Sequence, residues 1–251
     1  MLLTQRDFVY RAPGIFPTLW QARHCYGVHV LSAGFLVMAV LVMVLVLIEA
    51  RPKMPRWQYG VVKVVASLWF VAVGAIKVAE IDGAPYARWL FLGALALSLV
   101  GDVLLIPKGH KGVFFAGLFA FLAAHVLYVP AFVARGVDVT AIAVAVVVLG
   151  APAALVLRWL KRHVKGSMWP PVAAYVVVIT AMLATAIGAV SYGLTHSGGA
   201  TPALAIGAFA FWCSDVCVAR QRFVRPALVN KVIGVPLYFF AQLGLIAGAA
   251  G

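Results

Sequence analysis

Eight long apolar segments constrain this chain more than any other feature. A helix needs about 20 consecutive apolar residues to cross the hydrocarbon core of a bilayer. Segments of this kind, separated by charged residues, Pro or Gly, fall at residues 27–48, 60–79, 88–106, 113–133, 139–157, 170–190, 203–219 and 232–249. They are continuously apolar rather than alternating, and lipid cannot pair an exposed backbone, so they predict helices and not barrel strands. We expect an all-α membrane protein, a bundle of eight transmembrane helices.

The composition leaves room for little else. Of 251 residues, 65% are hydrophobic and 11% are charged, whereas a soluble domain is roughly half apolar. A soluble enzyme, a disordered tail and a disulfide scaffold are therefore excluded. The connections are short, so we expect one transmembrane domain over residues 27–251. It follows an N-terminal arm, residues 1–26, that lacks the pattern of a removable signal peptide.

The basic residues lie mostly on one side of the predicted bundle. The chain has 20 Lys and Arg against 7 Asp and Glu, a net charge of +13. The connections after the first, third, fifth and seventh spans hold 13 of the basic residues, and the opposite side holds five: Arg6, Arg11, Arg23, Arg88 and Arg135. This asymmetry predicts cytoplasmic basic loops, both termini outside, and a bacterial inner membrane. Membrane lipids, and not nucleic acid, are the expected partners of this charge; the sequence does not predict an oligomeric state.

Two carboxylates lie within the apolar spans, Asp102 in the third and Asp215 in the seventh. Ionisable groups inside a membrane are costly and commonly mark a functional site. Both lie roughly 8 Å inside the inner end of their span, at a rise of ~1.5 Å per residue. Either one could simply pair with a basic residue such as Lys63 to orient the helices. The matched depth on two helices favours a shared site instead.

Further polar residues approach the same region. Lys63 and Tyr238 share the layer of the two aspartates, while three others lie deeper by roughly 8 to 15 Å. Tyrosine and glutamine in spans often join helices through hydrogen bonds, but here we expect them to form a pocket wall. The predicted substrate-binding residues are Lys63, His125, Tyr128, Ser214, Tyr238 and Gln242.

A short internal repeat relates the two halves of the chain. Gly101-Asp102-Val103 corresponds to Ser214-Asp215-Val216, and the same shift of 113 residues aligns His125 with Tyr238. Each tripeptide is followed by a basic loop and another span. The pattern suggests two parallel four-helix halves that meet at the two acids.

The two carboxyls indicate acid–base chemistry. In a low-dielectric pocket both cannot comfortably ionise, so one is expected to act as an acid and the other as a base. Such a pair suits hydrolysis through protonation and an oxocarbenium ion, as for acetals, vinyl ethers and epoxides, and a site within the bilayer implies a lipid. A zinc hydrolase would need three protein ligands, but within the spans His125 is joined only by His29 at the edge of the first. No metal or organic cofactor is expected.

A different class of function fits the same residues. In a transporter or a lipid-binding membrane protein the paired aspartates would bind a proton or a cation, and the two halves would rock about them. Discontinuous helices would favour that alternative, and the third and seventh spans contain no proline.

Two blocks carry a resemblance to a known family. The first is Leu97-Ser98-Leu99-Val100-Gly101-Asp102 with Phe115-Ala116-Gly117-Leu118, Phe121, His125 and Tyr128; the second is Gly207-Ala208-Phe209 with Phe211, Ser214-Asp215, Phe223, Tyr238 and Gln242. Together they resemble the YhhN-like lysoplasmalogenase family, which commonly has Lys-Pro where this chain has Lys63-Val64.

The resemblance implies an ether hydrolase and a lysophospholipid substrate. The reaction would cleave the sn-1 vinyl ether of a lysoplasmalogen to a fatty aldehyde and a glycerophosphocholine or glycerophosphoethanolamine. Asp102 and Asp215 would be the catalytic acids, Lys63 would face the phosphate, and His125 and Tyr128 would line the pocket.

Overall fold

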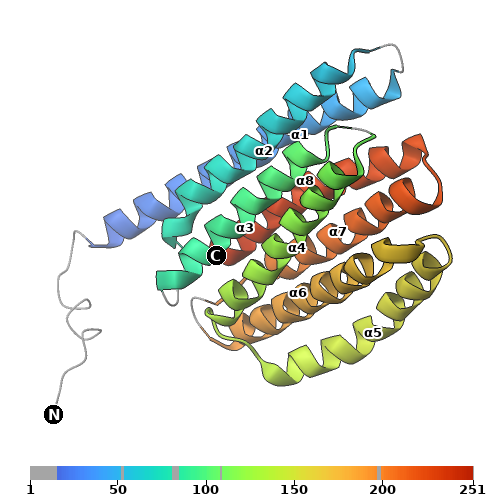
Figure 1. Ribbon diagram of the computed structural model, residues 1–251. Helices are drawn as coiled ribbons and strands as arrows, with labels where there is room; N and C mark the ends of the chain where they lie inside the picture. The colour runs from blue at the N-terminus through green and yellow to red at the C-terminus, as the bar shows by residue number, and fades with distance from the viewer. Residues whose placement is uncertain (1–15, 52–53, 81–84, 108, 197–198, 251) are drawn as a thin grey trace.

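The computed structural model describes residues 16–51, 54–80, 85–107, 109–196 and 199–250. Its helices are α1 (Phe16–Ala50), α2 (Arg56–Lys77), α3 (Pro85–Leu104), α4 (Lys111–Val133), α5 (Val139–Lys161), α6 (Trp169–Thr195), α7 (Pro202–Ala219) and α8 (Leu228–Ala250). Short helical turns lie at Val78–Glu80 and Gly166–Met168, and a π-helical turn, η4 (Arg220–Val224), follows α7. All eight long helices are long and apolar enough to cross a membrane. The chain is an integral, multi-pass, all-helical membrane protein, as the apolar segments predict (Figure 1).

The predicted spans and the observed helices agree closely except at the start of α1. That helix begins at Phe16 and runs without interruption through residues predicted as an N-terminal arm, and its segment His29–Ala50 is long and apolar enough to span a membrane. Residues 1–15 of the predicted arm lie outside the described part of the chain. The division into arm and transmembrane domain stays a prediction.

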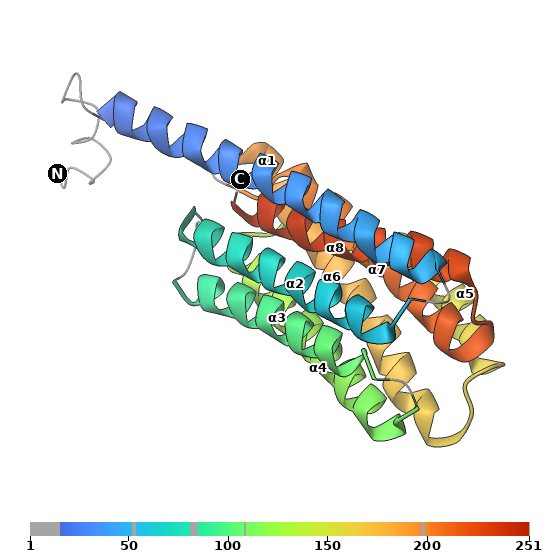
Figure 2. The ribbon, with the colours of Figure 1, turned by 90° about the horizontal axis from the view of Figure 1, so that it is seen from above.

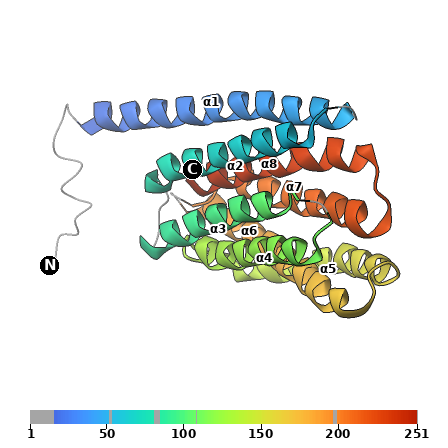
Figure 3. The same cartoon turned by 45° about the horizontal axis from the view of Figure 1, so that its top comes forward.

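Six helices form a closed ring, and two pack on its outside. Around the ring, α2 contacts α3, α3 contacts α4, α4 contacts α6, α6 contacts α7, α7 contacts α8, and α8 returns to α2. Helix α1 packs on α2 and α8, while α5 packs on α6. Figures 1 and 3 show α1 and α5 at opposite edges of the bundle, and Figure 2 shows α1 running along one edge. The two aspartate-bearing helices, α3 and α7, occupy separate positions in the ring.

The packing repeats between the two halves with the shift seen in the sequence. The contact of α2 with α3 corresponds to that of α6 with α7, and α3 with α4 corresponds to α7 with α8. In detail, Ser67 Oγ lies 3.0 Å from the Lys63 carbonyl oxygen, and Thr180 Oγ1, 113 residues later, lies 2.7 Å from the Val176 carbonyl oxygen. The repeat is broken at one place: α1 packs on α8, but α5 has no comparable packing on α4 among the described residues.

Small residues bring the helices of each hairpin close beside the aspartates. A Cβ added at Gly101, the neighbour of Asp102, would lie 2.6 Å from the Phe121 ring of α4. A Cβ at Gly234 of α8 would lie 2.9 Å from the Cβ of Cys217, two residues after Asp215 in α7. Because any side chain at these two positions would push neighbouring helices apart, the glycines set the distance between the walls of the site.

Candidate active site

Both aspartates line one cavity of about 850 Å³ near the end of the bundle where α1, α3, α5 and α7 finish. Its volume lies within the roughly 300–1,000 Å³ typical of small-molecule sites. The wall includes aromatic side chains from three helices, Phe121, Tyr175 and Tyr238. Helices α3 and α7 are not neighbours in the ring, but both bring their carboxyls to this cavity, as the matched depth predicts.

Asp102 is enclosed by hydrogen-bond donors. Lys63 Nζ lies 3.0 Å from Oδ1, and the hydroxyls of Ser67 and Tyr238 each donate to Oδ2 at 2.6 Å. The Asp102 side chain is only 2% exposed, and that of Lys63 is 12% exposed. A buried carboxylate with a cationic partner and two further donors has the contacts that stabilise its ionised form.

A directed chain of hydrogen bonds fixes the Tyr238 hydroxyl. Tyr128 OH donates to Gln242 Oε1 at 2.9 Å, and Gln242 Nε2 donates to Tyr238 OH at 3.4 Å. Because the tyrosine oxygen accepts from Gln242, its own proton is directed to Asp102. The deep polar residues of α4 and α8 thus act through one another on the Asp102 carboxylate.

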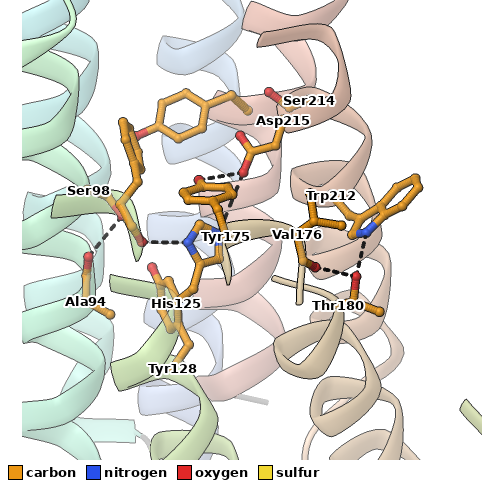
Figure 4. A network of polar contacts seen from close by, with 12 residues as sticks. Ala94, Ser98, His125, Tyr128, Tyr175, Val176, Thr180, Trp212, Ser214 and Asp215 are labelled. Carbon is orange, nitrogen blue, oxygen red and sulfur yellow. Dashed lines mark hydrogen bonds and ion pairs between the residues drawn. The ribbon is translucent and has the colours of Figure 1, made fainter. Parts of the chain in front are cut away.

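Asp215 has a different environment. Its Oδ2 accepts a hydrogen bond of 2.7 Å from Tyr175 OH on α6 and lies 3.9 Å from His125 Nε2 on α4 (Figure 4). The described residues place no lysine or arginine within ion-pair distance of Asp215. Its side chain is 17% exposed, more than that of Asp102. Asp215 is therefore a carboxyl with one neutral donor that faces the cavity.

The tautomer of His125 follows from its contacts. Nδ1 lies 2.6 Å from the Phe121 carbonyl oxygen, which can only accept, so Nδ1 carries a proton and donates. In the neutral ring Nε2 is then an acceptor, and it is buried without a hydrogen-bond partner. The rings of Tyr175 and Phe211 hold the imidazole in edge-to-face contacts with centroids 5.3 and 4.7 Å away. His125 Nε2, an acceptor, lies 3.9 Å from Asp215 Oδ2. Two acceptors face each other favourably only when one of them carries a proton, so this contact favours a protonated Asp215 carboxyl.

An ion cluster lines the cavity where α1 ends and where α2 and α8 begin. Glu49, at the end of α1, contacts Arg56 Nη1 of α2 at 3.2 Å through Oε1 and Lys231 Nζ of α8 at 2.5 Å through Oε2. All three residues line the cavity. A further cation, the Arg222 guanidinium of η4, lies 4.2 Å from the centre of the Phe114 ring of α4.

The structure brings together most, but not all, of the predicted site residues at the cavity surface. Asp102, Asp215, Lys63, Ser214 and Tyr238 line it. Ser214 uses its hydroxyl to donate to the Gly234 carbonyl at 2.9 Å, joining α7 to α8.

The three deeper residues, His125, Tyr128 and Gln242, lie behind the wall rather than on it. The aromatic side chains of Phe121, Tyr175 and Tyr238 line the cavity in front of them. The resemblance implies that Lys63 contacts phosphate. In the structure Lys63 is paired with Asp102, which is the ion pair between helices that the sequence also leaves open.

Sequence reasoning missed Ser67 and Tyr175. Ser67 follows Lys63 by one helical turn and so shares its face, a spacing that could have revealed it. Tyr175 is a polar residue near the inner end of a predicted span, at the level of the aspartates, but nothing in the sequence indicates that it points toward Asp215.

The fold and the site define a multi-pass membrane protein with two acids in an intramembrane cavity. Residues 58–249 match the model of the YhhN family, and the chain belongs to that family. It is 30% identical over 203 residues to the mouse protein named lysoplasmalogenase TMEM86B, which covers 78% of this chain and 76% of that protein.

Other relatives carry the same activity in their names. The human lysoplasmalogenase TMEM86B is 33% identical over 154 residues, 61% of this chain and 60% of that protein. A lysoplasmalogenase of Mycobacterium bovis is 32% identical over 170 residues, 64% of this chain and 60% of that protein. No solved structure matches the chain.

Proposed function

We propose that this protein hydrolyses the sn-1 vinyl ether of a lysoplasmalogen, releasing a fatty aldehyde and a glycerophosphocholine or glycerophosphoethanolamine. One observation carries the proposal: two aspartates with unequal partners, Asp102 and Asp215, line the same intramembrane cavity. Family membership and the names of the relatives support a hydrolase and a lysophospholipid substrate. The residues alone do not decide among acetals, vinyl ethers and epoxides as the substrate. The relatives named lysoplasmalogenase favour the vinyl ether of a lysoplasmalogen.

The unequal partners support an assignment of the two roles. Asp215, with one neutral donor and the acceptor Nε2 of His125 beside it, is the proton donor. Asp102, held by Lys63, Ser67 and Tyr238, is the carboxylate that receives a proton from water. A carboxylate with so many donors is a weak base, but an oxocarbenium ion is a strong electrophile and needs only a weak base to assist water.

The steps conserve protons over one turnover. Asp215 gives its proton to the outer carbon of the vinyl ether, and the oxocarbenium ion forms. Water attacks the carbon next to oxygen while Asp102 takes one of its protons, and a hemiacetal results. The bond to the glycerol oxygen then breaks: Asp102 returns its proton to that oxygen, and Asp215 takes the proton of the hemiacetal hydroxyl. Both carboxyls end as they began.

The test measures aldehyde release by purified wild type, Asp102→Asn and Asp215→Asn from 1-alkenyl lysolipids. Each substitution is expected to lower kcat by at least ~10²-fold, the typical contribution of general acid–base catalysis. Asp138→Asn is the matched control, because Asp138 caps α5 at the opposite end of the bundle and lies outside the cavity. Undiminished release from either site variant would remove that residue from the mechanism. No release by wild type, together with aspartate-dependent proton uptake into vesicles, would favour the transporter.

The cavity end of the bundle is also the basic end, and we propose that it faces the cytoplasm with both termini outside. A C-terminal fusion to alkaline phosphatase should be active and a fusion to green fluorescent protein dark. The reverse pattern would overturn this orientation.

A further inference from the structure

The cavity changes character from one edge of the bundle to the other. On the side of α4, α5 and α6 most of the lining is apolar, and comprises Phe114, Leu118, Val156, Leu160, Val172 and Val176 among others. The polar exceptions are Tyr175, His110 at the start of α4, and Arg222, which lies over the Phe114 ring. On the side of α1, α2 and α8 the lining includes the ion cluster of Glu49, Arg56 and Lys231. Helices α1 and α5 lie at opposite edges of the bundle (Figure 3). Asp102 contacts side chains of α2 and α8, and Asp215 contacts Tyr175 of α6, so the aspartates lie between the two sides of the cavity.

The apolar end exists because the internal repeat is broken there. Helix α1 closes against α8, but α5 packs on α6 without a comparable contact to α4. Leu160 and Val156 of α5 instead join a separate hydrophobic cluster with Val172 and Val176 of α6, against which Leu118 of α4 packs. The second half of the molecule therefore lines its side of the cavity with apolar side chains, where α5 does not close against α4.

The polar end presents two cations held by one carboxylate. The Glu49 side chain is 7% exposed and that of Lys231 is 23% exposed, so this pair is shielded from the open surface. The Arg56 side chain, at 64%, is exposed. With one carboxylate between two cations, the cluster carries a net charge of +1. The phosphate diester of a lysolipid carries one negative charge and can bind to these cations, since Lys and Arg commonly bind phosphates. Lys63 does not serve there, because it is bound to Asp102.

We propose that the cavity holds a lysophospholipid in one orientation, with its hydrocarbon chain against α4, α5 and α6 and its phosphate at Arg56 and Lys231. The ether bond, between chain and headgroup, then lies in the part of the cavity that Asp102 and Asp215 line. This inference rests on the proposed function for the identity of the reacting bond, but the orientation itself concerns binding.

The chain half of the proposal is tested with Val156→Trp, which fills the apolar end. Its matched control is Leu155→Trp on the same helix, because Leu155 is 68% exposed at the outer surface and does not line the cavity. Val156→Trp should lower kcat/KM for long alkenyl chains by about fourfold for each methylene that no longer fits, and leave short chains unaffected. Leu155→Trp should keep the wild-type profile.

The phosphate half is tested with Lys231→Gln against 1-alkenyl lysophosphocholine and 1-alkenylglycerol, which lacks the phosphate. KM should rise about tenfold for the phospholipid, as for the loss of one charge-assisted contact, and stay constant for the alkenylglycerol. Arg158→Gln, at an exposed inner-end position outside the cavity lining, is the control. The double variant Glu49→Gln/Lys231→Gln repeats the measurement without an unpaired carboxylate and should give the same split.

Binding of a non-hydrolysable 1-alkyl ether lysolipid to the same variants separates the two proposals. If wild type binds this ligand with the predicted dependence on Val156 and Lys231 but releases no aldehyde, the proposed function fails and the orientation stands. If wild type releases aldehyde but Val156→Trp keeps the chain-length profile, or Lys231→Gln weakens both substrates equally, the orientation is overturned.

Discussion

The two aspartates occupy equivalent positions in the internal repeat but have opposite surroundings. Asp102 receives an ammonium and two hydroxyls, whereas Asp215 receives one tyrosine hydroxyl and faces an imidazole acceptor. The repeat also crosses over: His125 of the first half approaches Asp215 of the second, and Tyr238 of the second half donates to Asp102 of the first. Under the same shift His125 corresponds to Tyr238 and Lys63 corresponds to Val176. Different residue types at equivalent positions therefore give two like carboxyls different surroundings.

The largest expected effect on stability comes from removing the ion pair between Lys63 and Asp102. Lys63→Met leaves a buried carboxylate without its cation, which costs about 3–5 kcal/mol when one partner of a buried pair is removed. Thermal unfolding in detergent should therefore show a large loss for Lys63→Met. Lys161→Met, at an exposed position, should change little. The double variant Lys63→Met/Asp102→Asn should recover most of the loss, and failure to recover would mean that the charge of Asp102 is not what Lys63 stabilises.

A matched pair of tyrosine substitutions compares the two carboxyls directly. Tyr238→Phe removes a donor from Asp102, and Tyr175→Phe removes the donor from Asp215. Hydrogen bonds to charged groups are worth about 2 kcal/mol and neutral ones about 1 kcal/mol. We expect the free energy of unfolding in detergent to fall by about 2 kcal/mol in the first variant and by about 1 kcal/mol in the second.

The order of these two effects is the informative result. If Tyr175→Phe lowered the free energy of unfolding more than Tyr238→Phe, Asp215 would be the ionised carboxyl and the assignment of acid and base would be reversed. Tyr128→Phe, two steps farther along the hydrogen-bond chain, should have a smaller effect than Tyr238→Phe.

The smallest effect is expected at Asp138, an aspartate with a purely structural position that serves as a reference for the other two. It caps α5 by accepting from the Ala141 backbone N–H at 3.1 Å and from Ser191 Oγ at 2.8 Å. These hydrogen bonds, first that of Ala141, lower the pKa of the Asp138 carboxyl from its ordinary value of 3.8. Its contribution to stability is therefore complete above that value and is lost as the pH falls through the lower pKa of the folded state.

Thermal unfolding of wild type and Asp138→Ala tests this effect. The difference in Tm should be small at about pH 7 and should shrink further below about pH 4, the ordinary range of an aspartate pKa. Asp138→Asn should retain the cap, because asparagine is an equally good N-cap residue. A difference that grows in acid would contradict the sign.

Much of the fold follows from hydropathy alone. The eight spans, the matched depth of Asp102 and Asp215 and the internal repeat are properties that can be counted along the chain, because each helix meets the same bilayer thickness. The sequence also identified Lys63 and Tyr238 as members of the acidic layer. It placed His125, Tyr128 and Gln242 in the pocket wall, whereas these side chains lie behind the wall and act on the carboxyls through contacts that depth cannot reveal.

The chain by itself determined that the protein spans a membrane eight times and that its few buried acids mark a site, since both conclusions depend only on the cost of placing each residue in hydrocarbon. Tertiary structure alone decided which partners each acid has, that Tyr175 and Ser67 belong to the site, and that one end of the cavity is apolar and the other cationic. Those features depend on how each helix is rotated about its axis and on which helices pack together. Lipid solvates all apolar faces alike, so small residues and interhelical hydrogen bonds, and not hydropathy, select the packing.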